Sequence, residues 1–404
     1  MKKLTLKFGG TSVGTVDKIK KVANIVKKRQ EEGNQIIVIV SAMAGITNDL
    51  MSKSKSVSKN FDNKELDVLI SSGEQVSSSL LAGALIELGM KSRSWQGWQI
   101  PILTDGNYNS SKIIKIKIDE ILKFISESGI AVISGFQGIS ENNRITTLGR
   151  GGSDLSAVAI AKFFQTDLCE IYTDVEGVLT TDPSMNKNAK KIEKISYEEM
   201  LEMASLGAKV MQPSAVQASM VDNIPIHVRS TFLEKSGTKI ISDNEIDHKK
   251  AVTGIAYSKN NAKISIVGVI DKPGVAAEVF EPIGKNNINI DMVIQNTSLD
   301  GKNANITFTI KQEDLNKTLN ILENNKKNIN YNKITHDEKL AKVSIIGAGM
   351  IASPGVTHKM FRSLANENIN ILAISTSEIK ISVLIQEELT QKAVKILHKT
   401  FDLD

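Results

Sequence analysis

Short apolar runs alternate with amphipathic stretches along the first part of the chain. Residues 4–8 and 35–40 are apolar enough to predict buried strands, and residues 15–32 between them place Ile19 and Val22 on one face of a helix. Strand, helix and strand at this spacing are typical of a right-handed βαβ unit whose parallel sheet is covered on both faces. The hydrophobic pattern therefore predicts an α/β fold here.

The same alternation recurs further along the chain. Apolar strands are predicted at residues 131–134, 169–174 and 224–229, the last of them closing this domain. Residues 71–75 (Ser-Ser-Gly-Glu-Gln) precede a predicted Ala/Leu-rich helix that ends near Gly89. Polar or glycine-rich loops follow strand after strand, and the carboxyl ends of parallel strands meet at one edge of a sheet. Because open α/β sheets bind ligands at that edge, we expect the functional site there.

An internal repeat follows a polar stretch at residues 243–250. Residues 263–268 (Lys-Ile-Ser-Ile-Val-Gly) match residues 342–347 (Lys-Val-Ser-Ile-Ile-Gly), and in both copies Pro-Gly-Val and Asn-Ile-Asn-Ile follow. Each copy has the pattern β-α-β-β-α. A strand is available to the first copy near residues 328–333, and we predict that a strand at residues 252–257 completes the second. The predicted domains span residues 1–245, 250–338 and 339–404.

The composition excludes several classes of protein. A chain of 404 residues with 41% hydrophobic and 24% charged residues is typical of a globular protein of two or three domains. Its net charge of +5 comes from scattered lysines without interleaved aromatics, so no nucleic-acid partner is expected. The single cysteine, Cys169, and the lack of a membrane span or signal peptide predict a cytoplasmic protein with no membrane partner. The histidines show no ligand spacing, so no metal site in the protein is expected.

Residues 147–154 (Thr-Leu-Gly-Arg-Gly-Gly-Ser-Asp) are the most distinctive stretch. A glycine-rich turn that opens a helix presents unpaired backbone N–H groups where the helix dipole favours an anion. Arg150 adds a planar donor suited to a carboxylate or a phosphate. The alternative interpretation is a purely structural turn. Other anion-binding motifs elsewhere in the chain favour the binding site over this alternative.

A lysine accompanies it at the end of a predicted strand. Lys7 precedes Gly9-Gly10, where it could reach a phosphate while the bare backbone approaches closely. The sequence contains no Walker motif, no protein-kinase set and no Gly-x-Ser-x-Gly elbow. It therefore offers cationic and N–H donors rather than a nucleophile with its base.

Six ordered motifs resemble those of the aspartokinase family, and the two repeats resemble its tandem ACT domains. The motifs are Lys7-Phe-Gly-Gly-Thr-Ser-Val13, Val40-Ser-Ala-Met43, Ser72-Gly-Glu74, Gly135-Phe-Gln-Gly138, Thr147-Leu-Gly-Arg-Gly-Gly-Ser-Asp154 and Tyr172-Thr-Asp-Val175. The resemblance covers essentially the whole chain. It implies an amino-acid-kinase α/β/α sandwich with a mostly parallel sheet, followed by two ferredoxin-like ACT domains (βαββαβ).

The resemblance also implies an activity and its residues. An aspartokinase transfers the γ-phosphoryl group of MgATP to the side-chain carboxylate of L-aspartate, giving 4-phospho-L-aspartate for lysine, threonine, methionine and diaminopimelate synthesis. The implied catalytic residues are Lys7, Gly10 and Asp154. The implied aspartate site comprises Ser41, Thr47, Glu74, Arg150 and Ser153, with Arg150 on a carboxylate and Glu74 on the amino group. The implied ATP site comprises Lys7, Gly9, Gly10, Thr173, Asp174, Asp182 and Lys209.

Two features of this implied chemistry can be examined in the sequence. The acceptor carboxylate, with a pKa of about 4, is already anionic at neutral pH and needs no general base, and none is apparent. Mg²⁺ is expected to be held chiefly by the ATP phosphates, without a protein ligand. The family usually continues Asp-Pro-Arg and often carries a tyrosine nearby, whereas this chain has Ser184 and Leu179. The departure puts the arginine contact to the nucleotide in question.

The resemblance places a regulatory site in the first repeat. Its implied residues are Asp271, Gly274, Val275 and Ala276 at a helix start, and Asn289, Asp291 and Gln295 on the next strand. The expected effector is lysine or threonine, and the expected assembly is a homo-oligomer through the ACT domains, with a separate regulatory subunit as a further option. Three alternatives stay open: repeats that only dimerise, an acceptor like that of glutamate 5-kinase or acetylglutamate kinase, and a non-catalytic amino-acid sensor.

Overall fold

The computed structural model describes residues 1–207, 210–297, 301 and 303–404, which divide into two compact units. The first unit comprises Met1–Leu179 and Lys191–Asp247, and the second comprises Thr180–Lys190 and His248–Asp404. The sequence prediction assigns residues 180–190 to the first domain, whereas in the structure they belong to the second unit. No helix within the described ranges is both long and apolar enough to cross a membrane.

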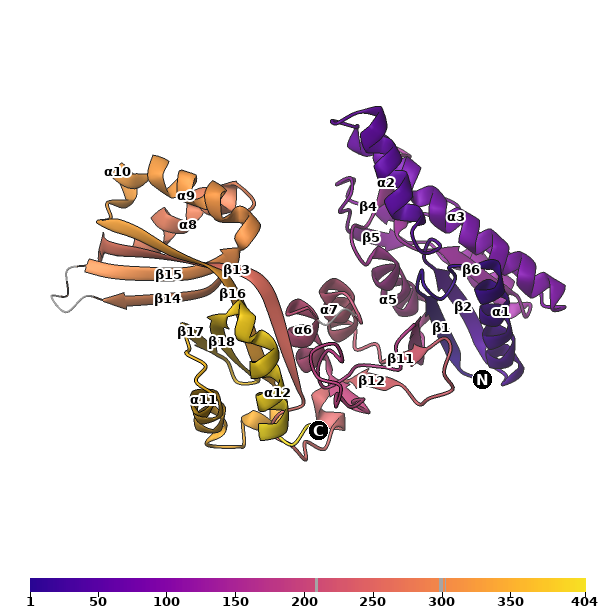
Figure 1. The fold of residues 1–404 in the computed structure, drawn as a ribbon. Coiled ribbons are helices and arrows are strands. Elements are labelled where there is room, and N and C mark those ends of the chain that lie inside the picture. Colours follow the sequence, from indigo (N-terminus) through magenta and orange to yellow (C-terminus); the bar gives the residue numbers. More distant parts are fainter. Residues whose placement is uncertain (208–209, 298–300, 302) are drawn as a thin grey trace. The chain divides into compact units, whose positions relative to one another are not determined.

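An eight-stranded sheet forms the centre of the first unit, in the order β10-β12-β11-β9-β1-β2-β6-β3 (Figure 1). Only the pair of β11 and β12 is antiparallel within it, so the predicted α/β class with a mostly parallel sheet is confirmed. The strand predicted to close the domain is β11, but β12 follows it and pairs with it. The strands are β1 (Lys3–Phe8), β2 (Gln35–Val40), β3 (Ser92–Trp95), β6 (Ile130–Ser134), β9 (Leu168–Thr173), β10 (Lys194–Ser196), β11 (Ile226–Ser230) and β12 (Thr238–Ile241).

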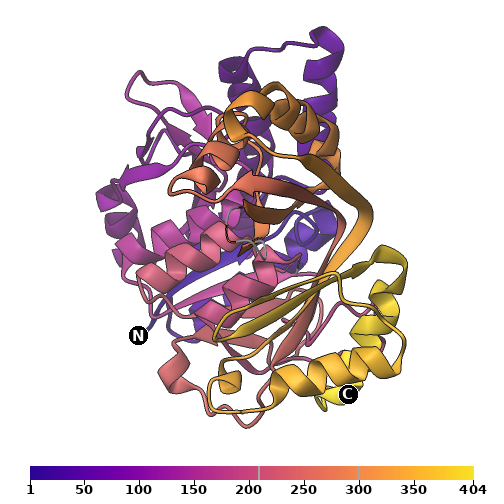
Figure 2. The ribbon, with the colours of Figure 1, turned by 90° about the vertical axis from the view of Figure 1, so that its left-hand side faces the viewer.

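Helices cover both faces of this sheet, as Figures 1 and 2 show. Alternate strand residues such as Leu6 and Val38 pack against α1 and α3 in one buried core, while α5 packs on the opposite face against β1, β2 and β9. The helix predicted at residues 15–32 is α1, and Thr15 caps it by accepting from the backbone N of Lys18. The helices are α1 (Val16–Glu31), α2 (Ile46–Val57), α3 (Asn63–Glu87), α4 (Asp119–Ser126), α5 (Gly152–Phe164), α6 (Tyr197–Ser205) and α7 (Pro213–Val221).

The start of α3 differs from the prediction. Residues 71–75 were expected to precede the helix, but they lie in its middle, because Asp62 caps it nine residues earlier than Ser71. The buried face of this helix is largely polar, so its early turns lack the apolar periodicity that reveals a helix. Gly73 is required inside it because a Cβ there would lie 2.7 Å from the Cβ of Ala42.

A smaller sheet of four short strands lies beside α3, in the order β5-β4-β7-β8. Its last strand ends at Thr147, immediately before the glycine-rich turn that opens α5. This sheet therefore delivers the turn to the end of the main sheet. The strands are β4 (Ile102–Thr104), β5 (Ile113–Ile116), β7 (Gln137–Ile139) and β8 (Ile145–Thr147).

The second unit is built on a six-stranded antiparallel sheet, β14-β15-β13-β16-β18-β17, with a separate apolar core for each repeat. The strands are β13 (Gly254–Ile270), β14 (Asp291–Thr297), β15 (Asn303–Lys311), β16 (Lys333–Ile346), β17 (Ala373–Thr376) and β18 (Lys380–Gln386). The helices are α8 (Val275–Lys285), α9 (Leu315–Asn324), α10 (Lys326–Ile329), α11 (Val356–Asn366) and α12 (Thr390–Thr400).

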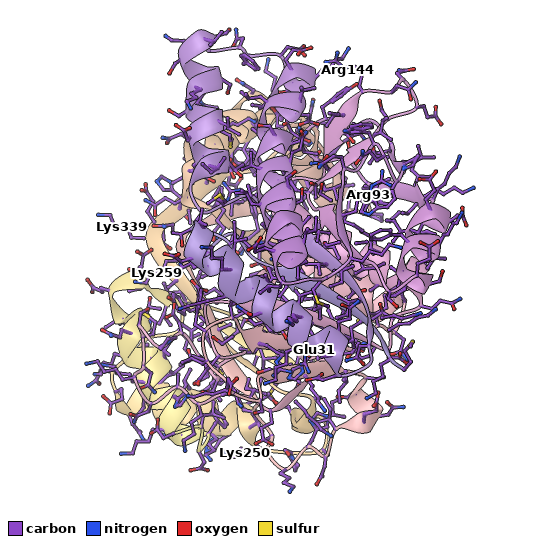
Figure 3. All side chains as sticks on the ribbon, turned by 90° about the vertical axis from the view of Figure 1, so that its right-hand side faces the viewer. Glu31, Arg93, Arg144, Lys250, Lys259 and Lys339 are labelled. Atoms are coloured by element: carbon purple, nitrogen blue, oxygen red, sulfur yellow. The ribbon has the colours of Figure 1, made fainter. Side chains whose placement is uncertain are left out.

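The repeats share their two longest strands. In β13, residues 254–258 pair with residues 342–346 of the second copy, and residues 261–270 pair with β15 of the first copy. Both strands bend where their register shifts, and Asn260 and Lys339 there have positive φ of 57° and 53°. Lys259 and Lys339 mark the bend in Figure 3.

The strand predicted for the first repeat near residues 328–333 begins later than expected, because residues 333–337 of β16 supply it by pairing with residues 263–267 of β13. Most of residues 328–333, expected to be a strand, instead form the end of α10 and a turn at Asn330, whose φ is 51°. The left-handed conformation of Asn330 reverses the chain, so β16 begins only at Lys333.

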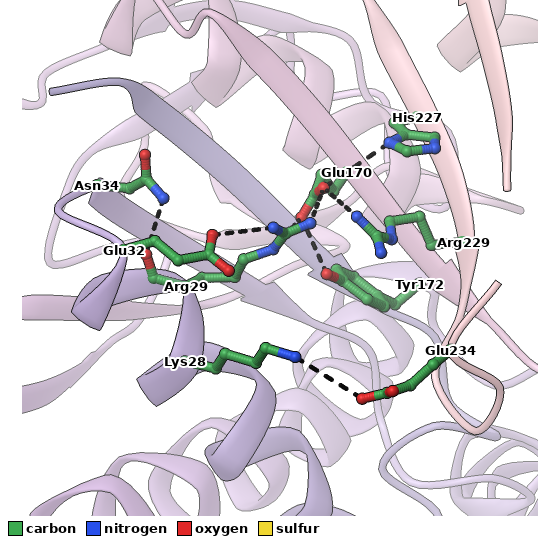
Figure 4. A network of polar contacts seen from close by, with 9 residues as sticks. All are labelled: Lys28, Arg29, Glu32, Asn34, Glu170, Tyr172, His227, Arg229 and Glu234. Carbon is green, nitrogen blue, oxygen red and sulfur yellow. Dashed lines mark hydrogen bonds and ion pairs between the residues drawn. The ribbon is translucent and has the colours of Figure 1, made fainter. Parts of the chain in front are cut away.

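A buried charge cluster lies under the last turn of α1 (Figure 4). We call it the Glu170 cluster, and it consists of Arg29, Glu170, Tyr172 and Arg229. Arg29 donates to both oxygens of Glu170 at 2.5 and 3.1 Å, Arg229 donates at 3.1 Å, and the Tyr172 hydroxyl donates at 2.9 Å. Burial and the neighbouring carboxylate raise the pKa of Tyr172 to about 12. The cluster thus ties α1 to β9 and β11 through one fully partnered carboxylate.

Candidate active site

The carboxyl-terminal ends of β1, β2, β6 and β9, with the loops that follow them, form what we call the carboxyl edge. Lys7 lies next to the end of β1, where its neighbours in register are Ile39 of β2 and Ile171 of β9. Its ammonium lies 2.5 Å from Asp154 Oδ1 in the first turn of α5, and the two side chains are only 11% and 9% exposed. The pair places a fixed cation beside the start of a helix, where the backbone dipole is also positive.

The loops after β1 and β2 touch through their backbones. Ala44, in the loop after β2, donates its N–H to the Gly10 carbonyl at 3.1 Å. On the other side, Gly9 donates its N–H to the carbonyl of Tyr172 in β9, also at 3.1 Å. A Cβ at Gly10 would lie 2.8 Å from the carbonyl oxygen of Ala42, so no larger residue fits. These contacts hold a side-chain-free surface next to Lys7, as a polyanion site requires.

Glu74 reaches the same edge from α3. Its Oε1 accepts from the backbone N of Ala42 at 3.0 Å, whereas its Oε2, also buried, has no hydrogen-bond partner within the described part of the chain. Burial raises the pKa of Glu74 to about 7, although the bond from Ala42 opposes this shift. Ser77, one turn later, donates to the carbonyl of Ser41 at 2.8 Å. A buried oxygen without a partner is costly, and a cationic ligand would satisfy it.

The glycine-rich turn adopts a backbone that only glycine tolerates easily. Gly149 and Gly151 have φ of 75° and 70°, and a Cβ at Gly151 would lie 1.8 Å from the side chain of Gln212. Arg150 between them is exposed, and none of residues 1–207, 210–297, 301 and 303–404 pairs with its guanidinium. The turn thus presents a free cation. Ser153 follows within α5 and packs closely against Gly135. A Cβ added at Gly135 would lie 2.9 Å from the Cβ of Ser153.

The residues expected on the nucleotide side are divided between the two units. Thr173 ends β9 and donates its hydroxyl to Asp174 at 3.1 Å, with Asp174 exposed. Asp182 belongs to the second unit, where it accepts from the Tyr257 hydroxyl at 3.0 Å. Lys209 lies outside the described residues. Thr47, expected on the aspartate side, lies in the first turn of α2 and is half-buried.

The predicted effector residues lie in the second unit. Gly274 is the N-cap of α8 with φ of 95°, so Val275 and Ala276 open that helix, and Asp271 is exposed before it. Asn289 and Gln295 are also exposed. Asp291 forms an ion pair with Lys342 of the second repeat, and its carbonyl accepts from Thr309 at 2.8 Å. Of these side chains, that of Asp291 thus already has a cationic partner.

Sequence reasoning missed Asp67, a buried acid close to the glycine-rich turn. Asp67 of α3 is fully buried and accepts from both the backbone N and the hydroxyl of Thr147, at 2.8 and 2.7 Å. It stands seven residues before Glu74, a spacing that puts two side chains on one helix face. That spacing is a usable sign once residues 63–87 are known to be one helix.

Known proteins resemble the chain throughout its length. The amino acid kinase family matches residues 2–230, and the ACT domain matches residues 264–325 and 343–401. An aspartate kinase of Pseudomonas putida is 45% identical over 399 residues, covering 98% of this chain and 97% of that protein. Aspartokinase 2 of Bacillus subtilis is 42% identical over 397 residues, with coverages of 98% and 97%. The crystal structure of Clostridium acetobutylicum aspartate kinase matches with a TM-score of 0.80 at 26% identity, covering 98% of this chain and 100% of that one.

These matches agree with the geometry in both units. The carboxyl edge of the first unit carries a fixed lysine, bare glycine backbone and an exposed arginine. The second unit carries the paired repeats that the ACT matches cover. The chain therefore belongs to the aspartokinases of the amino acid kinase family, ATP-dependent phosphotransferases with tandem allosteric ACT domains.

Proposed function

We propose that the protein transfers the γ-phosphoryl group of ATP to the side-chain carboxylate of L-aspartate, giving 4-phospho-L-aspartate as the first step toward lysine, threonine and methionine. The observation that carries this proposal is the buried Oε2 of Glu74, for which the described residues provide no hydrogen-bond partner. An anion in that position needs a cation, and the ammonium group of an amino-acid substrate supplies one at the edge where Lys7 lies. A substrate without an amino group would leave the oxygen unsatisfied.

The remaining groups fit an aspartate molecule. Arg150 provides a free planar cation for a substrate carboxylate, and Ser41, Thr47 and Ser153 provide hydroxyls. Because the acceptor carboxylate is already ionised, no residue has to remove a proton from it. The reaction instead requires that two anions approach each other, so positioning and positive charge are what the protein contributes.

Lys7 supplies that positive charge at the reacting centre. Its ion pair with Asp154 fixes the ammonium before substrates arrive, so little reorganisation is needed when negative charge develops. Gly9 and Gly10 admit the phosphates close to the backbone, and Thr173, Asp174, Asp182 and Lys209 are proposed for the nucleotide. Magnesium neutralises phosphate charge when it is bound, and we propose that the phosphates hold it. Among the described residues, no group of three or more His, Cys, Asp and Glu gathers as a metal site.

We further propose feedback inhibition by lysine or threonine at the first ACT repeat, with oligomer formation through the ACT domains. The start of α8 offers backbone N–H groups to an amino acid's carboxylate, and Asn289, Asp291 and Gln295 offer polar groups for the rest. The Asp291 carboxylate has to exchange part of its contact with Lys342 to receive an ammonium group.

A hydroxamate assay tests this function directly. The purified protein is incubated with MgATP and, in parallel, L-aspartate, L-glutamate or N-acetyl-L-glutamate, with hydroxylamine to trap the acyl phosphate. We expect product from aspartate alone, and less of it when lysine or threonine is added. Product from glutamate or acetylglutamate instead would identify the other acceptors, and no product from any acid would indicate a sensor without activity.

A further inference from the structure

One face of α3 is polar although it is buried. Asp67, Ser71, Glu74 and Ser78 recur at intervals of four, three and four residues, which places them on one side of the helix, and all are at most 3% exposed. Glu74 binds the loop after β2, and Ser78 contacts Ser134 at the end of β6 at 2.9 Å. Asp67 performs the corresponding task for a third segment of the carboxyl edge.

That segment is the base of the Arg150 turn. Asp67 accepts from the backbone N of Thr147 at 2.8 Å and from its hydroxyl at 2.7 Å, and the backbone N of Asn109 lies 3.1 Å from both carboxylate oxygens. Burial raises the pKa of Asp67 above its ordinary value, and the bonds from Thr147 and Asn109 oppose that shift. The carboxylate is therefore retained at a desolvation cost, with only neutral donors among these partners.

Both partners of Asp67 support the turn itself. Ser111 donates its N–H to the Thr147 carbonyl at 2.9 Å, which joins the segment of Asn109 to that of Thr147. Two residues after Thr147, Gly149 packs so tightly on this segment that a Cβ would lie 2.9 Å from the carbonyl oxygen of Asn109. The next residue is Arg150. Asp67 thus fixes both sides of the turn from which the free arginine projects.

We propose that Asp67 is a positioning residue for the substrate-binding arginine, acting through Thr147 and Asn109. This inference rests on the proposed function, since it takes Arg150 to receive a carboxylate of aspartate. Arg150 is exposed, so its direction is set by the backbone beneath it rather than by packing of its own side chain. Loss of the Asp67 contacts lets the turn move, which weakens aspartate binding while the phosphate side at Lys7 and Gly10 stays in place.

The test compares Asp67→Ala with Asp67→Asn. In Asp67→Ala, the N–H groups of Thr147 and Asn109 lose their acceptor, and we expect the KM for aspartate to rise about tenfold, because small displacements of a positioning group have effects of this order. The KM for ATP should change less than twofold. Asp67→Asn should restore most of the aspartate affinity, since its amide oxygen can accept from Thr147 N and its amide nitrogen can donate to the Thr147 hydroxyl.

A control variant, a second test variant and an exchange measurement separate positioning from simple stability. Glu170→Gln alters another buried carboxylate of the same unit and should leave both KM values unchanged. Thr147→Val removes only the hydroxyl donor, and it carries the test if Asp67→Ala does not fold, with an expected rise of about threefold in the aspartate KM. Hydrogen–deuterium exchange of residues 145–150 should also be faster in Asp67→Ala than in the wild type, whichever acid is phosphorylated.

The outcomes are distinct. If Asp67→Ala lowers the melting temperature but leaves the aspartate KM at the wild-type value, Asp67 is structural only and the proposal is wrong. A parallel rise of the aspartate and ATP KM values also contradicts it, because the whole edge would then have moved. If the wild-type protein makes no acyl phosphate from aspartate, the proposed function fails, and unchanged exchange in Asp67→Ala would reject the control of the turn as well.

Discussion

Two buried carboxylates of the first unit, Glu170 and Glu74, have opposite surroundings. Glu170 accepts from two arginines and a tyrosine in the Glu170 cluster, with hydrogen bonds to both oxygens (Figure 4). Glu74 accepts one backbone bond on Oε1, and its buried Oε2 has no partner in the described ranges. A fully partnered acid holds elements together, whereas a partly partnered acid at the same depth is prepared for a ligand. We therefore propose a structural role for Glu170 and a ligand-binding role for Glu74.

The cations of the two regions differ in the same way. The guanidinium of Arg29 is committed to Glu170 and Glu32, so it has little capacity for a ligand. Within the described residues, Lys7 contacts one carboxylate and lies beside bare glycine backbone, and no residue pairs with the exposed Arg150. We therefore propose that catalysis depends on hydrogen-bonding groups left open for a ligand rather than on the density of charge. Four substitutions or titrations test this comparison, in order of their expected effect on catalysis.

The largest effect is expected from Lys7→Ala. Removal of a preorganised cation at the reacting centre should lower kcat by at least about a hundredfold, the scale for loss of one stabilising group. Lys3→Ala, which changes a lysine at the other end of the same strand, should leave kcat near the wild-type value. Steady-state kinetics with aspartate and MgATP measure both. A folded Lys7→Ala variant with near-normal turnover would remove Lys7 from the mechanism.

Arg150→Ala should have the next largest effect. Loss of a charge-assisted contact of about 2 kcal/mol corresponds to a decrease of about thirtyfold in kcat/KM for aspartate. Arg144→Ala is the matched control, because Arg144 lies just before β8, six residues before Arg150, but pairs with Glu65 at 2.5 Å. An equal decrease in both variants would show that general surface charge, and not the free arginine, attracts the substrate.

Local pattern was sufficient to predict the strands and helix at the start of the chain and the duplicated carboxyl-terminal unit. The apolar period of Ile19, Val22 and Val26 survives in α1 because that helix buries an apolar face. It fails for α3, whose buried face includes Ser71, Glu74 and Ser78, so that a polar period conceals a core helix. Apolar periodicity predicts helices that bury an apolar face, but it does not predict helices whose buried face forms hydrogen bonds.

The site was predicted as residues but not as contacts. Lys7 and Asp154 were both expected, yet their ion pair joins positions far apart in sequence, and the packing of α5 on β1 brings them together. Residues 180–190 were also misassigned for lack of a local signal. In sequence they lie between β9 and β10 of the first unit, but Met185 is buried in the core of the second repeat. Long-range packing of this kind leaves no local trace in the sequence.

The pH dependence of aspartate binding is the third test. Burial raises the pKa of Glu74 to about 7, so below pH 7 the carboxyl is neutral and a poor partner for the substrate ammonium. We expect kcat/KM for aspartate to rise up to tenfold per pH unit below pH 7 and to level off above it. The acidic limb should vanish in Glu74→Gln, which has a uniformly lower kcat/KM. An unchanged limb in that variant would assign it to another group.

The same titration makes a separate prediction for stability. The unfolded carboxyl has an ordinary pKa of 4.5, so between pH 4.5 and about 7 the folded protein binds a proton that the unfolded chain releases. This contribution to the free energy of unfolding is fully present below pH 4.5 and is lost as the pH rises through about 7. Chemical denaturation of wild type and Glu74→Gln across this range measures it, and Glu74→Gln should lack the decline.

The smallest effect on catalysis is expected from Glu170→Gln, although its effect on stability should be substantial. Removal of one partner from a buried ion pair costs roughly 3–5 kcal/mol, but Arg29 and Arg229 keep 19% and 26% exposure and can regain water. We therefore expect the free energy of unfolding to fall by about 2 kcal/mol, with kcat and both KM values unchanged. A change in the aspartate KM would show that the Glu170 cluster communicates with the carboxyl edge, and the distinction between a partnered and an unpartnered carboxylate would then no longer separate structure from function in this fold.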